Sequence, residues 1–277
     1  MSKNTPKKKV GLALSGGAAR GMAHVGVLDV LHEAGIPIDM IAGTSAGAVM
    51  GAVYASGMDM QKMIEKALDA KWKKFTPLVD PSFPKTGLLK GAKIKSLLAS
   101  FMGGELDFKD LKIPFTCVAT DIDTGEEVLM DRGPLLDALR ATISVPGIFA
   151  IVERGGRYLV DGGLTTPVPV HVVKNMGADF IIAVNVNADV SDRMGKSGIK
   201  RVKKHKEPNI LSILMQSFYI TTYSLARRTM EEADVIIEPD MPHIGTSDFS
   251  KAEEMIEKGR QAARAALPEI RRKLGEG

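Results

Sequence analysis

The sequence predicts an α/β fold with a largely parallel central sheet. Short apolar segments of strand-like composition alternate with longer segments of helical periodicity along most of the chain, and this alternation is typical of strand–helix–strand units. A length of 277 residues and a hydrophobic content of 44% are sufficient for a sizeable core. We therefore expect residues 1–277 to form one domain.

The first half of the chain predicts two strand–helix units followed by a third helix. Asp59 stands where it would cap that third helix. Residues 72–110 then lose the strand pattern and gain prolines and paired glycines, so we interpret them as a lid or insertion. The predicted strands are residues 8–14 and 38–44, and the predicted helices are residues 19–35, 45–57 and 60–70.

The second half begins with a predicted hairpin whose turn is at residues 123–125. A basic loop and an apolar helix occupy residues 195–230, and Ser250 and Glu253 have the spacing of a capping box at the start of the last helix. The predicted strands are residues 113–122, 126–130, 157–163, 178–187 and 233–239, and the predicted helices are residues 134–144, 169–177 and 250–267.

Charge and cysteine content exclude several functional classes. A net charge of +4 is too small to indicate a nucleic-acid partner. The single Cys117 excludes an internal disulfide, and no Cys or His residues have metal-ligand spacing. The apolar run Val10–Leu14 is too short for a secretory signal, and no segment has the length and hydropathy of a clear membrane span. We expect a cytoplasmic protein without a metal or cofactor.

A candidate nucleophile lies in the sequence GTSAG, residues 43–47. A glycine-x-serine-x-glycine string between a strand and a helix is typical of a nucleophile elbow, in which a sharp turn exposes the serine. Bulk at Gly43 or Gly47 would collide with neighbouring elements, and the following helix would direct its N-terminus toward Ser45. The pattern therefore predicts that Ser45 is a catalytic nucleophile.

The glycine-rich stretch ALSGGAARGMAHVGVL, residues 13–28, fits neither common nucleotide-binding pattern. No lysine follows Gly21 as a P-loop requires, and Gly16, Gly17 and Gly21 lack the spacing of the dinucleotide fingerprint. Backbone N–H groups at such a corner suit an oxyanion hole, with Arg20 adding positive charge nearby. The alternative is a tight strand-to-helix turn without a ligand.

A serine nucleophile needs a base, and the histidines are poor candidates. His24 and His171 lie within predicted helices, His205 lies in a lysine run, and His243 is the one plausible loop histidine. Asp161 ends a predicted strand in the turn DGG, and a carboxylate in contact with the serine hydroxyl can act as general base. We favour Asp161; Asp121 and Asp123 are rivals that fit equally well as turn residues.

These motifs together resemble the patatin-like phospholipase family, in its bacterial branch. The matching strings are SGGAARG at residues 15–21, GTSAG at 43–47, SVPGIF at 144–149 and DGG at 161–163, and the similarity runs from about Lys9 to Val186. The resemblance implies a patatin-type three-layer α/β/α catalytic domain, a Ser45–Asp161 dyad, an oxyanion hole at Gly16, Gly17 and Ala18, and calcium-independent hydrolysis of lipid acyl esters. Gly162 and Gly163 belong to the same DGG motif.

Two positions depart from that family's pattern. Ala18 stands where a third glycine is usual, and Thr166 stands after the DGG turn where asparagine is common. Both departures concern the geometry of the oxyanion hole. The resulting prediction is a lipid acyl hydrolase acting as a phospholipase, lysophospholipase or esterase. A thioesterase or acyltransferase using the same dyad is one alternative, and a weakly active or non-catalytic lipid- or protein-binding regulator is another.

The uncharged segment Pro208–Ala226 predicts a helix that is apolar over much of its circumference. One interpretation is burial against the sheet or against a partner subunit in a homo-oligomer. The other is peripheral contact with an anionic membrane, in which Lys203, Lys204 and Lys206 meet the head groups. The helical spacing places one set of residues on a common face: Leu211, Leu214, Met215, Phe218, Thr222 and Leu225.

Overall fold

The computed structural model describes residues 8–69, 91–187 and 210–275, and within these residues one mixed sheet has eight strands. The strand order is β5-β6-β3-β2-β1-β7-β8, and β4 pairs with β3 outside this path. The strands are β1 (Val10–Leu14), β2 (Met40–Thr44), β3 (Phe115–Asp121), β4 (Glu127–Met130), β5 (Val152–Arg154), β6 (Arg157–Asp161), β7 (Phe180–Val184) and β8 (Val235–Ile237).

The centre of the sheet is parallel, as the alternation of strands and helices predicts. β1 pairs in parallel with β2 and β7, β2 pairs in parallel with β3, and β7 pairs in parallel with β8. β1, β2, β3 and β7 are buried along their whole length, which accounts for their nearly continuous apolar sequences. The predicted hairpin at residues 123–125 is confirmed by the antiparallel pairing of β3 with β4.

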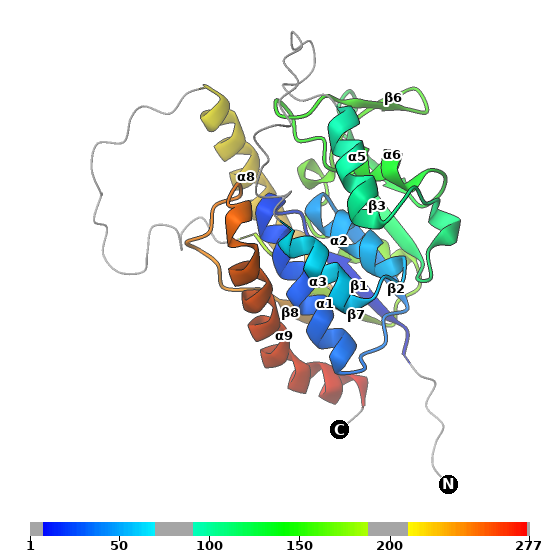
Figure 1. The fold of residues 1–277 in the computed structure, drawn as a ribbon, viewed down its shortest axis with the longest axis vertical. Helices are drawn as coiled ribbons and strands as arrows, with labels where there is room; N and C mark the ends of the chain where they lie inside the picture. Colours follow the sequence, from blue (N-terminus) through cyan, green and yellow to red (C-terminus); the bar gives the residue numbers. More distant parts are fainter. Residues whose placement is uncertain (1–7, 70–90, 188–209, 276–277) are drawn as a thin grey trace, which may run out of the picture.

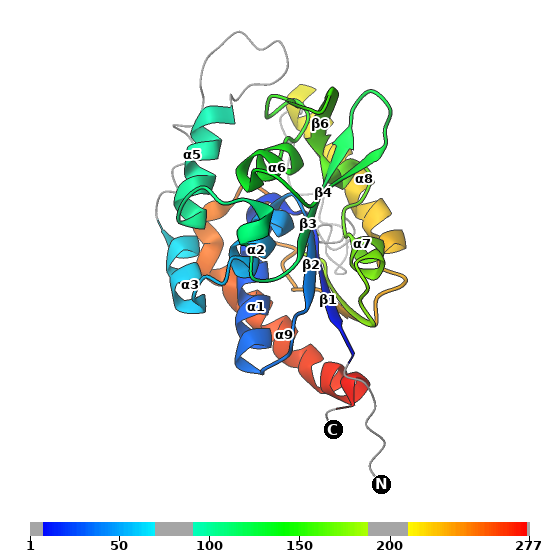
Figure 2. The ribbon, with the colours of Figure 1, turned by 90° about the vertical axis from the view of Figure 1, so that its right-hand side faces the viewer.

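Helices cover both faces of the sheet and complete three layers (Figures 1 and 2). One face carries α7 (Val170–Asn175) and α8 (Ile210–Thr229), which lie together on one side of the strands in Figure 2. The opposite face carries α1 (Ala23–Glu33), α2 (Ala46–Ala55), α3 (Met60–Leu68), α5 (Gly91–Met102), α6 (Leu135–Thr142) and α9 (Ala252–Leu274). The α/β/α class is therefore confirmed.

The first and last helices meet through two glycines. A Cβ built on Gly26 would lie 2.8 Å from the backbone N of Arg260, and one built on Gly259 would lie 2.9 Å from the carbonyl carbon of Ala23. Because each helix presents backbone to its neighbour, α9 packs closely against α1 although the two are more than 200 residues apart in sequence. This contact supports the helices that follow the first strand.

The ends of the helices match the prediction in part. Asp59 caps α3, since its side chain accepts from Lys62 N at 3.1 Å. The capping box at Ser250 is wrong: residues 249–251 form a 3₁₀ turn, and α9 begins at Ala252 without a side-chain cap bond. α9 also continues past Pro268 to Leu274, where buried Ile270 holds its last turns against the core.

The predicted lid and basic loop are described only in part. Residues 70–90 and 188–209, which include residues 72–90 of the lid and the three lysines of the proposed membrane contact, lie outside the described residues. Residues 91–102 of the lid region form α5. None of the described helices is both long enough and apolar enough to span a membrane.

The predicted apolar face of α8 is confirmed in part. Thr222 is buried, as is Ala226, and Met215, Phe218 and Leu225 are half-buried, whereas Leu214 is 55% exposed. Ile210, Ile213 and Ile220 are also exposed. The first half of α8 therefore carries apolar side chains that this chain's described residues leave in contact with solvent, so burial within the domain explains only the second half.

Candidate active site

Ser45 lies in the sharp turn between β2 and α2. Its φ of 51° and ψ of −121° are strained for a residue with a side chain. Both flanking glycines are required by space: a Cβ on Gly43 would lie 2.5 Å from Ala48 Cα, and a Cβ on Gly47 would lie 2.5 Å from Ser15 O. The sequence GTSAG therefore forms a compact turn that directs the serine side chain away from the sheet.

Ser45 and Asp161 are joined by a hydrogen bond. Ser45 Oγ donates to Asp161 Oδ2 at 2.6 Å, and the second carboxylate oxygen, Oδ1, accepts from Gly163 N at 2.8 Å. Both side chains are buried. Burial raises the pKa of Asp161 to about 6, and the hydrogen bonds from Ser45 and Gly163 oppose that rise. The carboxylate is therefore ionised at neutral pH with a pKa suited to a general base.

Asp161 approaches the serine on an antiparallel strand. β6 pairs with β3 so that Asp161 lies opposite Ala119, and β3 pairs with β2 so that Val118 lies opposite Thr44. The Asp161 carboxylate and Ser45 are therefore level across the sheet. Gly162 permits this approach, because a Cβ there would lie 2.8 Å from the carbonyl carbon of Val118.

The glycine-rich loop after β1 packs directly against Ser45. A Cβ on Gly16 would lie 3.3 Å from Ser45 Cβ. The N–H of Gly16 donates to Pro167 O at 3.1 Å, so it is already engaged. The N–H groups of Gly17 and Ala18 have no acceptor among the described residues, and Ala18 adopts a φ of 49°. This strain falls at the position where the sequence replaces the expected glycine.

Gly21 and Arg20 support the glycine-rich loop, the first through packing and the second through hydrogen bonds. Gly21 leaves room for Ala46, since a Cβ at residue 21 would lie 3.6 Å from Ala46 Cα and closer still to its side chain. Arg20 is buried, and its Nε and Nη2 donate to Ile244 O at 2.8 and 2.5 Å. It does not line the cavity described below, so the structure shows it tying the loop to the segment at residue 244.

Three of the histidines considered as bases have other partners. His24 is fully buried in α1, where its Nε2 donates to Ser15 O at 2.9 Å, and burial lowers its pKa to about 4. His171 contacts Glu127 at 3.0 Å, and His243 contacts Glu254 at 2.6 Å. His205 lies outside the described residues.

The rival aspartates lie at the β3–β4 turn, where the Asp121 side chain holds the backbone. Asp121 Oδ1 accepts from Asp123 N at 3.0 Å, and Asp121 Oδ2 lies 3.5 Å from Arg157 Nη1. Asp123 is exposed. Among the described residues, no group of three His, Cys, Asp or Glu side chains is placed to hold a metal ion.

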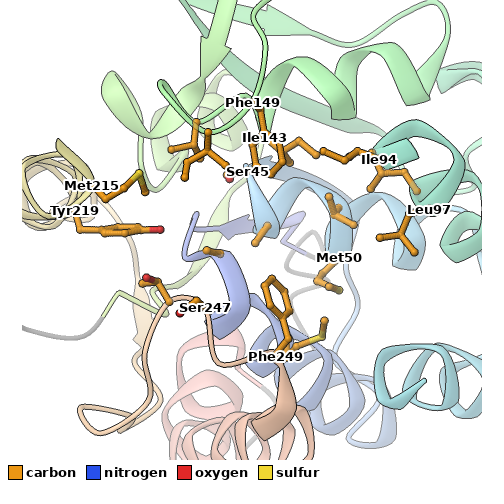
Figure 3. A pocket seen from close by; sticks show the side chains of 18 residues that line it. Ser45, Met50, Ile94, Leu97, Ile143, Phe149, Met215, Tyr219, Ser247 and Phe249 are labelled. Atoms are coloured by element: carbon orange, nitrogen blue, oxygen red, sulfur yellow. The ribbon is translucent and has the colours of Figure 1, made fainter. Parts of the chain in front are cut away.

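An apolar cavity of about 470 Å³ opens beside Ser45. Its walls come from α2, α5, the segment 143–149, α8 and the segment 246–249, and none of the described lining residues is charged. Figure 3 shows Met215 and Tyr219 of α8 on one side of Ser45, with Ile94 and Leu97 of α5 on the other. The serine hydroxyl therefore stands at the wall of a space suited to hydrocarbon.

Residues 12–174 match a family model described as patatin-like phospholipase. The chain belongs to the patatin-like phospholipase family. An uncharacterized NTE family protein of Mycobacterium tuberculosis is 32% identical over 277 residues, which cover 94% of this chain and 46% of that protein. Neuropathy target esterase sws of Drosophila melanogaster is 34% identical over 186 residues, covering 65% of this chain and 13% of its own. The chain thus spans less than half the length of these relatives.

VipD from Legionella pneumophila is a solved structure that aligns with this chain. Its TM-score is 0.48 at 14% identity, and the alignment covers 94% of this chain and 67% of that one.

Several residues around this patatin-like site carry no signal in the sequence. Ser45 N donates to Thr142 Oγ1 at 2.9 Å, and Thr142 Oγ1 in turn donates to Val118 O. The backbone of Asp161 is held by Ser144 O, which accepts from Asp161 N at 2.9 Å, and by Thr120 Oγ1, which donates to Asp161 O at 3.1 Å. Ser144 is the exception, because it begins the SVPGIF string, and Thr142 lies two positions before that string.

Proposed function

We propose that this chain hydrolyses acyl esters of lipids, with Ser45 as nucleophile and Asp161 as general base. The observation that carries this proposal is the 2.6 Å hydrogen bond from Ser45 Oγ to Asp161 Oδ2 at the wall of the uncharged cavity. Membership of the patatin-like phospholipase family supports it. We also propose that one domain carries the whole site.

The proposed reaction has two halves. Asp161 accepts the Ser45 proton as Oγ attacks the ester carbonyl, and the N–H groups of Gly17 and Ala18 stabilise the negative oxygen. The intermediate collapses to an acyl-serine, and Asp161 returns the proton to the departing alcohol. Water then loses a proton to Asp161 while it attacks the acyl-serine. Asp161 returns that proton to Ser45 Oγ as the second intermediate collapses, and the fatty acid and free Ser45 are released.

The cavity is the proposed acyl-chain site. The walls formed by Ile94, Leu97 and Phe149 offer contact to methylene groups but no partner for a phosphate or carboxylate. Burying apolar area there contributes roughly 25 cal/mol per Å². Any charged head group would therefore remain outside the cavity.

The test compares the wild-type protein with Ser45→Ala on phospholipids, lysophospholipids, thioesters and p-nitrophenyl esters, with a fluorophosphonate probe to label the nucleophile. We expect the substitution to abolish hydrolysis and labelling without loss of folding. Because backbone amides stabilise the oxyanion in this mechanism, EDTA should leave hydrolysis of a soluble ester intact. Turnover that persists in Ser45→Ala contradicts the proposal, and a preference for thioesters or for acyl transfer to an added alcohol selects the alternative enzymes.

We further propose that the exposed first half of α8 contacts the lipid surface that supplies the substrate. Ile213, Leu214 and Ile220 are exposed on the helix whose Met215 and Tyr219 line the cavity. Apolar side chains next to the opening of a lipid site can enter the boundary between head groups and acyl chains. The basic sequence immediately before the helix supports an anionic surface.

A further inference from the structure

Glu127 is a largely buried carboxylate that does not line the active-site cavity. It lies on β4, its side chain is 24% exposed, and it receives two hydrogen bonds. Thr166 Oγ1 donates to Glu127 Oε2, and His171 Nε2 donates to Glu127 Oε1 at 3.0 Å. Glu127 therefore ties the edge of the sheet to the segment that follows the DGG turn.

That segment contacts the backbone around all three parts of the proposed site. Thr44 Oγ1 donates to Thr166 O at 2.7 Å, one residue before the nucleophile. Gly16 N donates to Pro167 O at 3.1 Å, one residue before the oxyanion amides begin. Thr166 N donates to Gly162 O at 2.8 Å, directly after the base. The backbone of two consecutive residues, Thr166 and Pro167, thus joins the loops of nucleophile, oxyanion hole and base.

The side chain of Thr166 fixes where those two carbonyl groups lie. It is 3% exposed, and its hydroxyl has Glu127 as its recorded acceptor. The loops that the carbonyls hold lie so close together that a Cβ added to Gly16 would be 3.3 Å from Ser45 Cβ. A shift of the 166–167 segment would therefore change the position of the oxyanion amides relative to Ser45.

Glu127 is suited to hold this arrangement at neutral pH. Burial opposes its ionisation, but the hydrogen bonds from His171 and Thr166, together with the charge of His171, hold its pKa below the usual value. The hydrogen bond to Glu127 raises the pKa of His171, against the opposing effect of burial. The carboxylate thus accepts both hydrogen bonds in its ionised form, and charge-assisted bonds are the stronger kind.

We propose that Glu127, acting through Thr166, is a positioning residue that sets the geometry between Ser45 and the oxyanion amides. The inference rests on the proposed hydrolase function. It assigns to Glu127 and Thr166 an effect on the chemical step and none on acyl-chain binding, because neither lines the cavity. Displacing catalytic groups by about 1 Å can cost ~10²-fold in rate.

The test uses Thr166→Val, which removes the hydroxyl at nearly constant size, and Glu127→Gln, which removes the charge. Thr166→Ser keeps the donor and serves as the conservative rescue. Glu126→Gln is the matched control, because Glu126 is the adjacent exposed residue and its partner is Arg157 on the surface. Steady-state hydrolysis of a soluble p-nitrophenyl ester is measured for each variant, and active sites are counted by fluorophosphonate labelling of Ser45.

We expect Thr166→Val and Glu127→Gln to lower kcat per labelled site by about 10- to 100-fold, with KM little changed. The rate of Ser45 labelling should fall in parallel, while Thr166→Ser and Glu126→Gln stay near wild type. An unchanged kcat in both Thr166→Val and Glu127→Gln overturns the inference. A change in KM alone overturns it too, as does an equal fall of kcat in Glu126→Gln. If one variant fails to fold, the other decides.

Failure of the proposed function is recognised separately in the same assay. If Ser45→Ala retains turnover, or if the probe does not label Ser45 in the wild-type protein, the hydrolase proposal fails and the inference about Glu127 fails with it. If the wild-type protein is labelled and active but the Glu127 and Thr166 variants match it, only the positioning inference fails.

Discussion

Asp161 accepts a 2.6 Å hydrogen bond from the Ser45 hydroxyl while it is only 2% exposed to solvent. No charged partner compensates for this burial among the causes of its raised pKa, which are burial itself and the hydrogen bonds from Ser45 and Gly163. Keeping the Asp161 carboxylate ionised while it is buried lowers the stability of the folded protein. The raised pKa also makes this carboxylate a better proton acceptor for the neighbouring serine, as the proposed chemistry requires.

The first prediction concerns the identity of the base. Asp161→Asn should lower kcat/KM for a soluble ester by about 10²- to 10⁴-fold, the usual effect of losing a general base. His243→Ala should retain nearly full activity because His243 contacts Glu254 on the surface. His171→Ala should cost far less than Asp161→Asn. Equal losses at His243 and Asp161 would indicate a triad and contradict the dyad.

The second prediction is a pH profile. The pKa of Asp161 is raised to about 6, and only the ionised carboxylate can accept the serine proton. We therefore expect kcat/KM to rise with pH through about 6 and to level off above it. Initial rates on a soluble ester between pH 4.5 and pH 8 would show this, at about equal ionic strength. The rise should persist in His171→Ala and His243→Ala; its disappearance in either would assign it to that imidazole.

The third prediction links the base to stability. The pKa of Asp161 is above its ordinary value of 3.8, so the folded protein holds a proton that the unfolded chain releases as pH rises. Stability from this group is present at low pH and is lost as pH rises through about 6. Asp161→Asn removes the buried charge, so it should raise the free energy of unfolding near pH 8 by up to about 3 kcal/mol.

Urea unfolding at about pH 8 and about pH 4.5 measures this effect, and the gain should shrink at the lower pH. Asp123→Asn is the control, because Asp123 is exposed in the β3–β4 turn. If Asp161→Asn is less stable than the wild-type protein at about pH 8, the prediction is wrong, and the carboxylate is needed for folding as well as for activity.

The parts of the fold that depend on local pattern could be predicted from the sequence. The strands around Leu12, Ile41 and Ile182 have continuous apolar runs, and the strain at Ser45 follows from glycines on both sides of a strand-to-helix turn. Asp161 could be chosen because a DGG turn ends a strand. These features are encoded within about five residues each.

The remaining features depend on contacts between distant segments. Nothing local to β6 shows that it runs antiparallel to β3, and nothing at Gly259 shows that it meets α1. The hydrogen bond from Thr166 to Glu127 joins residues 39 positions apart. The common face predicted for α8 included Leu214, which is exposed, and left out Tyr219, which lines the cavity beside the correctly predicted Met215. Tertiary packing decided each of these positions.

The last prediction concerns α8 and the lipid surface. Ile213 and Leu214 are 46% and 55% exposed, so their replacement by glutamine should leave the fold intact while removing apolar contact with lipid. We expect the wild-type protein to sediment with anionic vesicles and not with neutral ones. The double variant Ile213→Gln/Leu214→Gln, and separately Lys203, Lys204 and Lys206→Glu, should reduce this binding, because apolar insertion and head-group attraction both contribute.

Ile236→Gln provides the matched control, because Ile236 is 44% exposed and belongs to β8 rather than to α8. Hydrolysis of a soluble ester, measured on the same preparations, reports whether the site is intact. If vesicle binding ignores lipid charge and all of these substitutions, the exposed face of α8 serves another partner. A concentration-dependent dimer that the α8 substitutions dissociate would identify that partner as a second copy of the chain, because an apolar helix face can be covered equally well by its own symmetry mate.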